Sequence, residues 1–188
     1  MKHYELVLLL NASLQDKDRK DFVASVEKEF HANIIQKDDI GLLKTAHDLW
    51  EKKGNDTFFF VSYYITATED NLNQIREFFK YNKVVYRYFL FGQNKTDEMF
   101  VYEKIQAEMN KIIEGRVEKK MGTKMTFFTH PENKKYITWK AIPMIKKYVT
   151  RFGNIKPRKY TGNAVAVQKS LRAAIIRARE MGLLEYIK

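Results

Sequence analysis

Cysteine is absent from the 188-residue sequence. Its absence excludes disulfide bonds, a thiolate nucleophile and cysteine-ligated zinc, and it is compatible with a reducing compartment. The four histidines, His3, His31, His47 and His130, stand far apart and share no metal-ligand spacing. We therefore expect no metal site and no other cofactor.

Motifs for catalysis are also missing. No pair of glycines frames the phosphate-cradling pattern G-x-x-x-x-G-K, and no serine lies in a nucleophile elbow. Asp38 and Asp39 are adjacent, so on a strand they point to opposite faces and make a poor catalytic pair. We expect no enzymatic activity and no small-molecule substrate.

Long apolar runs are lacking as well. The run in residues 1–11 is too short to span a bilayer, and no small-residue cleavage site follows it. The sequence is expected to begin directly with a strand, without a transit peptide, and no membrane partner is expected.

Acidic residues are scarce in the second part of the chain. Residues 1–115 carry 16 Lys and Arg against 19 Asp and Glu, a net charge of −3, whereas residues 116–188 carry 18 against 4, a net charge of +14. The second part is therefore a polycation, which predicts an anionic partner, in the first place a nucleic acid. A membrane surface is the lesser alternative.

The first part alternates strand-like and helix-like patterns. Apolar and β-branched runs predict strands, and three- and four-residue apolar spacing predicts helices. The order β-α-β-β-α-β is typical of an α+β, ferredoxin-like domain, assigned to residues 1–93. The elements are expected at residues 4–10, 16–30, 33–37 with a less regular continuation past Gly41, 57–67, 68–79 and 84–91.

The strand at 57–67 is unusually rich in aromatics. A sheet can present aromatic rings to single-stranded RNA. Phe58 and Phe60 share one face and Phe59, Val61 and Tyr63 the other, so at least one set belongs to the core. Because the strand has no basic residue to hold phosphates, stacking on RNA is the less favoured reading.

The remaining chain is expected to form a linker at 94–135 and a small all-α basic domain at 136–188. Within the linker, a helix is predicted at 96–120 and an extended or partly disordered connector at 121–135. Residues 139–152 predict the next helix, with lysines outward at 140, 146 and 147 and Gly153 as its C-cap.

Residues 151–179 pair a basic loop with a basic amphipathic helix. Thr161 is expected to cap the helix N-terminus, with Gly162 easing the turn, and an apolar stripe follows from Val167 to Met181. A helix N-terminus flanked by cations suits phosphate groups. The predicted RNA-binding residues are Arg151, Lys156, Arg158, Lys159, Thr161, Gly162, Lys169, Arg172, Arg177 and Arg179.

Residues 1–92 resemble bacterial small-subunit ribosomal protein six. The first seven residues are similar to that family's first strand, and Asp39–Lys44 resembles its W-G-L-R segment, with Ile40 where Trp is usual. Val85–Tyr88 resembles the V-x-R-x start of its last strand. The family's Leu-Ala-Tyr is not kept at residues 45–47.

Residues 137–186 resemble bacterial small-subunit ribosomal protein eighteen. Ile137–Lys140 is similar to its I-D-Y-K and Gly153–Arg158 to its G-K-I-x-P-R. The pattern T-G…Q-R-x-L…A-I-K-R-A-R is matched from Thr161 to Arg179, and L-L-P-Y at Leu183–Tyr186. The sequence departs from the family at Lys169 for Arg, Ile176 for Lys and Glu185 for Pro.

The two resemblances imply a head-to-tail fusion of a pair of proteins that bind ribosomal RNA of the small-subunit central domain, or platform, together. They imply a structural role in a bacterial or organellar ribosome, with ribosomal RNA and neighbouring small-subunit proteins as partners. The alternatives are a DNA-binding replication or transcription factor with a basic recognition helix, which would prefer a duplex sequence, and an enzyme on a ferredoxin-like scaffold.

Overall fold

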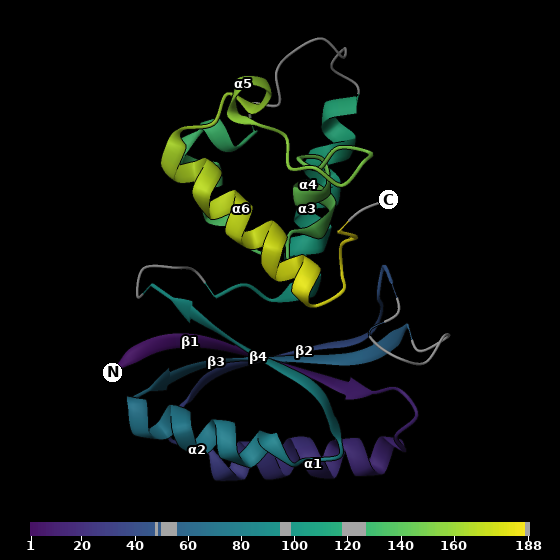
Figure 1. Ribbon diagram of the computed structural model, residues 1–188, viewed down its shortest axis with the longest axis vertical. Helices are drawn as coiled ribbons and strands as arrows, with labels where there is room; N and C mark the ends of the chain where they lie inside the picture. The colour runs from purple at the N-terminus through teal and green to yellow at the C-terminus, as the bar shows by residue number, and fades with distance from the viewer. Residues whose placement is uncertain (48, 50–55, 95–98, 118–126, 187–188) are drawn as a thin grey trace. The chain divides into compact units, whose positions relative to one another are not determined.

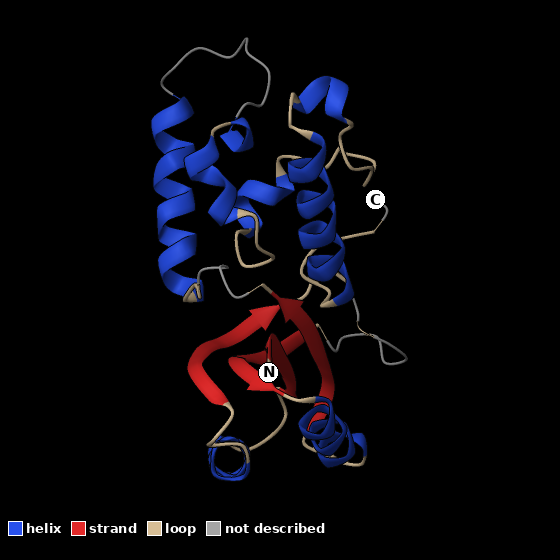
Figure 2. Ribbon diagram, turned by 90° about the vertical axis from the view of Figure 1, so that its left-hand side faces the viewer, coloured by secondary structure: helices blue, strands red, loops and turns tan. Residues whose placement is uncertain are grey.

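A computed structural model describes residues 1–47, 49, 56–94, 99–117 and 127–186. The chain divides into two compact units. The first unit comprises Met1–Lys44 and Thr57–Met99, and the second comprises Thr45–Asp56 and Phe100–Lys188. Among the described residues, the named strands all lie in the first unit and the second is built of helices and loops (Figure 2).

The first unit is a four-stranded antiparallel sheet with two helices on one face (Figure 1). Its strand order is β2-β3-β1-β4. This order and the sequence β-α-β-β-α-β confirm the predicted ferredoxin-like fold. The elements are β1 (Lys2–Asn11), α1 (Asp16–Glu29), β2 (Ile34–Lys44), β3 (Thr57–Ala67), α2 (Glu69–Lys80) and β4 (Val85–Gln93).

Strand β1 supplies the centre of the first core. Leu6, Leu8 and Leu10 alternate along one face of the strand, so all three point toward the helices. They pack with Phe22 of α1 and Phe79 of α2, whose rings meet edge to face at a centroid distance of 6.5 Å. The apolar periods of the sequence therefore predict which faces of these elements are buried.

Strand β2 is longer and more regular than the sequence suggests. It runs without interruption to Lys44, and its pairing with β3 shifts register between Asp39 and Gly41. Gly41 has φ = +83°, a conformation that costs glycine little and other residues more. The glycine thus forms a bulge within the strand, and the weak pattern beyond it reflects that bulge.

The second unit includes much of the predicted linker. Its elements are α3 (Tyr102–Val117), the short 3-10 helices η1 (Phe127–Thr129) and η2 (Pro131–Tyr136), α4 (Ile142–Lys146), α5 (Arg158–Thr161) and α6 (Val165–Glu180). Ile105 and Met109 of α3 and Phe127 and Phe128 of η1 are buried. The prediction of a linker at 94–135 is therefore wrong from Phe100 onward, because these apolar side chains belong to a core; residues 95–98 and 118–126 lie outside the described part.

The helix predicted at 139–152 is mostly absent. Only α4 is helical, with Pro143 in its first turn, where a proline is tolerated. Lys140, predicted to face outward, is fully buried, and its ammonium donates a hydrogen bond of 2.9 Å to the Phe100 carbonyl. Gly153, predicted as a C-cap, instead lies at φ = +85° in the turn that joins the bridged residues Val149 and Ile155.

The connection between β2 and β3 contributes to the second unit. The Ala46 N–H donates to the Gly182 carbonyl at 2.7 Å, and Leu49 is buried. Gly182 has φ = +75°, and a Cβ built on it would lie 2.9 Å from Leu49 Cδ2. The close approach of this leucine therefore requires glycine at position 182.

Tyr63 places a polar atom in the first core. Its side chain is fully buried in β3, and its hydroxyl has no hydrogen-bond partner among the described residues. Burial raises the pKa of the Tyr63 phenol well above its usual range, and the nearby carboxylates of Glu27 and Asp39 raise it further. The neutral form is therefore the only one that the folded protein accommodates at ordinary pH.

Replacing Tyr63 by phenylalanine should remove the buried hydroxyl without destabilising the fold. Because no hydrogen bond is lost, we expect Tyr63→Phe to change the free energy of unfolding by less than about 1 kcal/mol at pH 7. Above pH 10 the unfolded wild type loses the phenolic proton while the folded form keeps it, so wild-type stability falls as pH rises. Urea unfolding at pH 11 should show the wild type losing about 1 kcal/mol relative to the variant.

The matched control for this comparison is Tyr81→Phe. Tyr81 is 81% exposed, so its substitution removes a phenol hydroxyl from the same unit without changing the packing of the core. A loss of more than about 2 kcal/mol in Tyr63→Phe at pH 7 would contradict the assignment by revealing a hydrogen bond to the hydroxyl.

Candidate nucleic-acid interface

Helix α6 has one buried and one exposed face. Val167, Leu171, Ala174, Ile175, Ala178 and Met181 are all buried, which confirms the predicted apolar stripe. Lys169 and Arg172 are exposed on the other side of the helix. The period of the sequence thus orients α6 so that two of its cations face solvent.

The turn before α6 differs from the prediction. Thr161 ends the short helix α5, and Gly162, at φ = +69°, is the left-handed residue that terminates it. The N-cap of α6 is Ala164. The prediction of Thr161 as N-cap is wrong because the chain makes this extra turn between the loop and the helix.

Gln168 ties this turn and the preceding loop to α6. Its amide oxygen accepts hydrogen bonds from the Thr161 hydroxyl at 3.1 Å and from the Asn163 side-chain amide at 3.2 Å. Its amide nitrogen donates to the Lys156 carbonyl at 3.0 Å. Thr161 and Asn163 are fully buried. The loop is therefore held against the first turns of the helix by a buried amide network.

A surface groove forms where the loop meets α6. Its volume is about 350 Å³. The lining combines apolar side chains from both segments, the Gln168 amide and three cations. The lining residues are Ile155, Arg158, Val165, Gln168, Lys169 and Arg172. Three of the ten predicted RNA-binding residues, Arg158, Lys169 and Arg172, are thus brought together.

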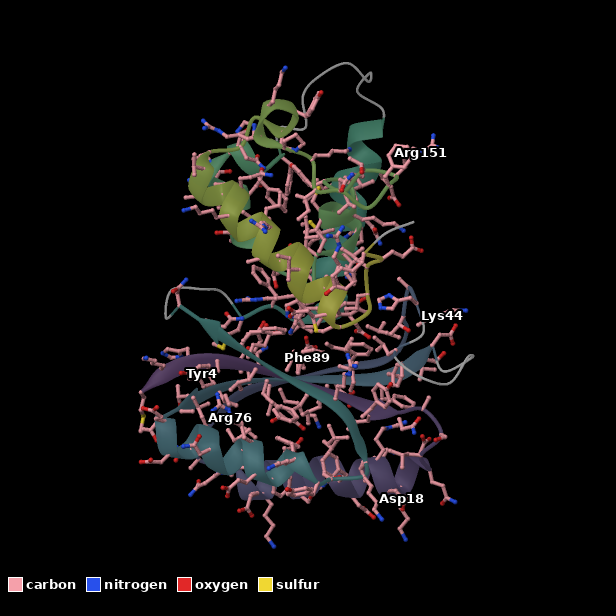
Figure 3. All side chains as sticks on the ribbon, viewed as in Figure 1. Tyr4, Asp18, Lys44, Arg76, Phe89 and Arg151 are labelled. Carbon is pink, nitrogen blue, oxygen red and sulfur yellow. The ribbon has the colours of Figure 1, made fainter. Side chains whose placement is uncertain are left out.

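Other predicted residues lie exposed but apart from this groove. Lys159 is exposed on α5 beside Arg158. Arg151 is exposed, its guanidinium carbon 5.0 Å from the Phe152 ring centroid, and its side chain extends at the margin of the unit (Figure 3). Arg151 borders a different hollow of about 250 Å³ that Lys146 also lines. The predicted basic surface therefore has two sections.

Lys156 and Arg177 are half-buried. The Lys156 ammonium donates a hydrogen bond of 2.8 Å to the Lys147 carbonyl, which fastens the loop to the segment after α4. Lys156 therefore has a structural contact that the sequence pattern did not indicate.

Arg179 is turned inward. It is 9% exposed, its Nε donates to the Glu185 carbonyl at 3.1 Å, and its Nη2 donates to the Gly153 carbonyl. Its guanidinium also lies 5.6 Å from the Tyr186 ring centroid. Arg179 joins the end of α6 to two other segments, and these inward contacts of its guanidinium differ from the exposed RNA contact that the sequence predicts.

Sequence reasoning missed the apolar part of the groove. Ile155 is half-buried, and Val165 is 54% exposed in the first turn of α6. One feature of the sequence could have indicated this role for Val165. It precedes the periodic apolar stripe of the helix and does not share the face of that stripe, so the pattern does not place it in the core.

Comparison with known proteins places the second unit in a family. The family model described as ribosomal protein S18 matches residues 133–184. Small ribosomal subunit protein bS18 of Mycoplasma capricolum is 41% identical over 68 residues, which are 36% of this chain and 89% of that protein. The corresponding protein of Dictyoglomus turgidum is 37% identical over 78 residues, 36% of this chain and 93% of its own. The chain belongs to the bS18 family.

The bS18 resemblance noted in the sequence is confirmed by these matches. A crystal structure of 30S ribosomal protein S6 from Thermotoga maritima is similar over 60% of this chain and 97% of its own, with 16% sequence identity and a TM-score of 0.44. The groove residues Arg158 to Arg172 all lie inside the bS18-matching segment.

Several residues of the bS18-like motifs have structural contacts here. Lys140, in the segment similar to I-D-Y-K, is buried, and its carbonyl accepts a hydrogen bond of 2.5 Å from the Gln106 amide of α3. Arg179 ends the segment similar to A-I-K-R-A-R. Motif positions of this bS18 member thus divide between an internal framework and an exposed cationic groove.

The described residues also bear on two other kinds of site, a membrane-spanning helix and a metal centre. Within the described ranges, no helix combines the length and apolar character that crossing a bilayer requires. Among the same residues, no cluster of three or more His, Asp or Glu side chains could hold a metal ion.

Arg179→Ala should weaken the fold of the second unit. The substitution leaves the Gly153 and Glu185 carbonyls without their donor, so we expect a loss of about 2–3 kcal/mol in the free energy of unfolding. Urea unfolding followed by tryptophan fluorescence, to which the buried Trp139 contributes, measures it. Arg172→Ala, an exposed arginine of the same helix, is the control and should stay within about 0.5 kcal/mol of wild type. Equal stabilities of the two variants would contradict the inward role of Arg179.

Proposed function

We propose that this protein is a structural constituent of the small ribosomal subunit that binds ribosomal RNA through its second unit. The single observation that carries the proposal is the match to bS18 proteins over 89% of the relative's length at 41% identity. The net charge of +14 in residues 116–188 supports it, because a surface of one sign needs a polyanion as partner.

The proposed mechanism is electrostatic. Arg158, Lys169 and Arg172 face solvent around one groove, and Arg151 and Lys159 are exposed nearby in the sequence. Each cation that neutralises a phosphate releases condensed counterions, which favours binding at low salt. The buried Gln168 network fixes the loop before contact, so binding requires little ordering of this segment.

We further propose that the first unit is the counterpart of small-subunit ribosomal protein six. Its support is the order of its elements, the opening segment Met1–Val7 and the segments Asp39–Lys44 and Val85–Tyr88. The chain would then be a fusion of two small-subunit proteins that bind the RNA of the platform. Its other partners would be neighbouring small-subunit proteins, and its place would be a bacterial or organellar ribosome. A covalent connection replaces a bimolecular encounter by a high effective concentration.

The direct test is sedimentation of the full chain with small ribosomal subunits. We expect it to sediment with the subunits at low salt and to be released at high salt. A competition assay with folded ribosomal RNA and duplex DNA separates this function from that of a DNA-binding factor. Preference for the duplex DNA would refute the proposal.

The affinity for RNA should fall steeply with salt. If about six phosphates are contacted, the association constant should drop by about three decades between roughly 50 and 200 mM salt. Filter binding or fluorescence anisotropy with a folded RNA at five salt concentrations measures the slope. A flat response would show that the cations are not the binding surface.

Arg172→Glu should weaken RNA binding while leaving the fold intact. Arg172 is exposed on the groove, so charge reversal removes one phosphate contact and adds repulsion. We expect at least a tenfold loss of affinity and a salt slope shallower by about one. Arg76→Glu, the same change on the exposed face of α2 in the first unit, is the matched control and should keep nearly full affinity. Loss of the circular dichroism signal in Arg172→Glu would instead assign the residue a structural role.

A further inference from the structure

The groove between the loop and α6 has a composition that phosphate binding alone does not explain. Val165 is 54% exposed, and with Ile155 it adds apolar side chains to a groove lining that also includes three cations. A surface that contacts only phosphates needs no such lining, because phosphate oxygens are recognised by charge and N–H donors. An occupant that has an apolar face as well as negative charge is complementary to this mixed lining.

The groove is held in shape by internal hydrogen bonds. Gln168 bonds to the Lys156 carbonyl, and Arg158 Nε donates to the Asn163 carbonyl at 2.9 Å. Both walls are therefore positioned before any ligand arrives. The volume of about 350 Å³ falls within the range of small-ligand sites.

The groove also offers a hydrogen-bond donor. A glutamine amide nitrogen carries two hydrogens. One N–H of Gln168 serves the Lys156 carbonyl. No described residue accepts a hydrogen bond from the other N–H, and Gln168 is one of the residues that line the groove. Apolar side chains, one amide donor and three cations in one lining match a nucleotide, which has a flat ring, polar ring edges and a phosphate on each side.

We propose that this groove binds one unstacked nucleotide of an RNA, with the base against Ile155 and Val165 and its flanking phosphates on Arg158, Lys169 and Arg172. The inference rests on the proposed RNA binding and goes beyond it by naming what the RNA must present. A base within a continuous duplex cannot reach the apolar lining, so the site selects a bulged or looped nucleotide. The cations bind the phosphates of the RNA backbone, and the contact of the base with Val165 gives the preference for an unstacked nucleotide.

The test uses two RNA hairpins of equal length and the full chain. One hairpin is fully paired, and the other carries a single bulged 2-aminopurine, whose fluorescence reports its stacking. We expect wild type to bind the bulged hairpin about tenfold more tightly and to change the fluorescence of the bulge. Val165→Ser removes the apolar contact at an exposed first-turn position, where serine is compatible with the helix. This variant should bind both hairpins with the affinity that wild type shows for the paired one.

Ala166→Ser is the matched control. Ala166 is the next residue, is also exposed in the first turn of α6 and does not line the groove. It should retain the preference for the bulge, and all three proteins should share one salt slope, because no cation is changed.

The outcomes separate this inference from the proposed function. Equal affinity of wild type for both hairpins, or an equal loss on both in Val165→Ser, would overturn the nucleotide site and leave RNA binding in place. Absence of binding to either hairpin would overturn the proposed function and the site with it. Displacement of the bulged RNA by an acidic peptide from wild type, and not from Val165→Ser, would assign the groove to a protein partner and overturn the inference as well.

Discussion

The half-buried amide of Gln168 is the interaction on which the basic surface depends. Without it, the loop at 155–163 and the helix α6 would carry their cations independently. Its oxygen accepts from Thr161 and Asn163 and its nitrogen donates to Lys156, so one side chain fixes three points of the loop on the helix. A group with donors and an acceptor is needed at this position, because the loop offers both a carbonyl and N–H or O–H groups. Fixing the loop brings Arg158 to the same groove as Lys169 and Arg172.

The second unit buries or partly buries several cationic side chains and yet keeps a large net positive charge. Burial of a cation normally calls for a carboxylate, and the second unit, Thr45–Asp56 with Phe100–Lys188, has ten Asp and Glu against 22 Lys and Arg. Lys140, Lys156 and Arg179 each donate to main-chain carbonyls. A carbonyl satisfies the donor by hydrogen bonding and carries no full negative charge of its own. The unit can therefore use some cations as internal ties and still act as a polycation toward a partner.

The sequence predicts the first unit well because its apolar periods and its topology agree. The β-α-β-β-α-β order and the leucines of β1 follow from spacing, and so does the apolar stripe of α6 in the second unit. Periodicity failed at residues 139–152, where apolar residues at helical spacing pack around short turns. It also failed at Arg179, which a helical projection places near Gln168 and Arg172. That projection contains no information about the segment at Gly182–Tyr186 that returns over the end of the helix.

The ten predicted RNA-binding residues show that the sequence pattern locates a basic stretch but does not tell which of its side chains are exposed. Charge and spacing select the right stretch, and Arg158, Lys169 and Arg172 meet there. Which cations point outward was decided by hydrogen bonds to Lys147, Gly153 and Glu185, all main-chain groups. Any residue can supply a main-chain carbonyl, so the side-chain pattern leaves no trace of such contacts. Val165 was missed because an exposed valine has no conspicuous chemistry until its neighbours are known.

The division into units limits which fragments of the chain can keep the packing of the second unit. The second unit contains Thr45–Asp56, a segment that is flanked in the sequence by the two parts of the first unit, Met1–Lys44 and Thr57–Met99. Leu49 is buried there, Gly182 leaves space for its side chain, and the Ala46 N–H is bonded to Gly182. No contiguous segment that omits the first unit includes these residues. A fragment beginning at Phe100 would lose a buried leucine and a main-chain hydrogen bond at the end of α6, beside the Arg179 contacts. In this chain the bS18-like part therefore depends on residues from the first half for its own packing, which a simple tether between two complete domains would not require.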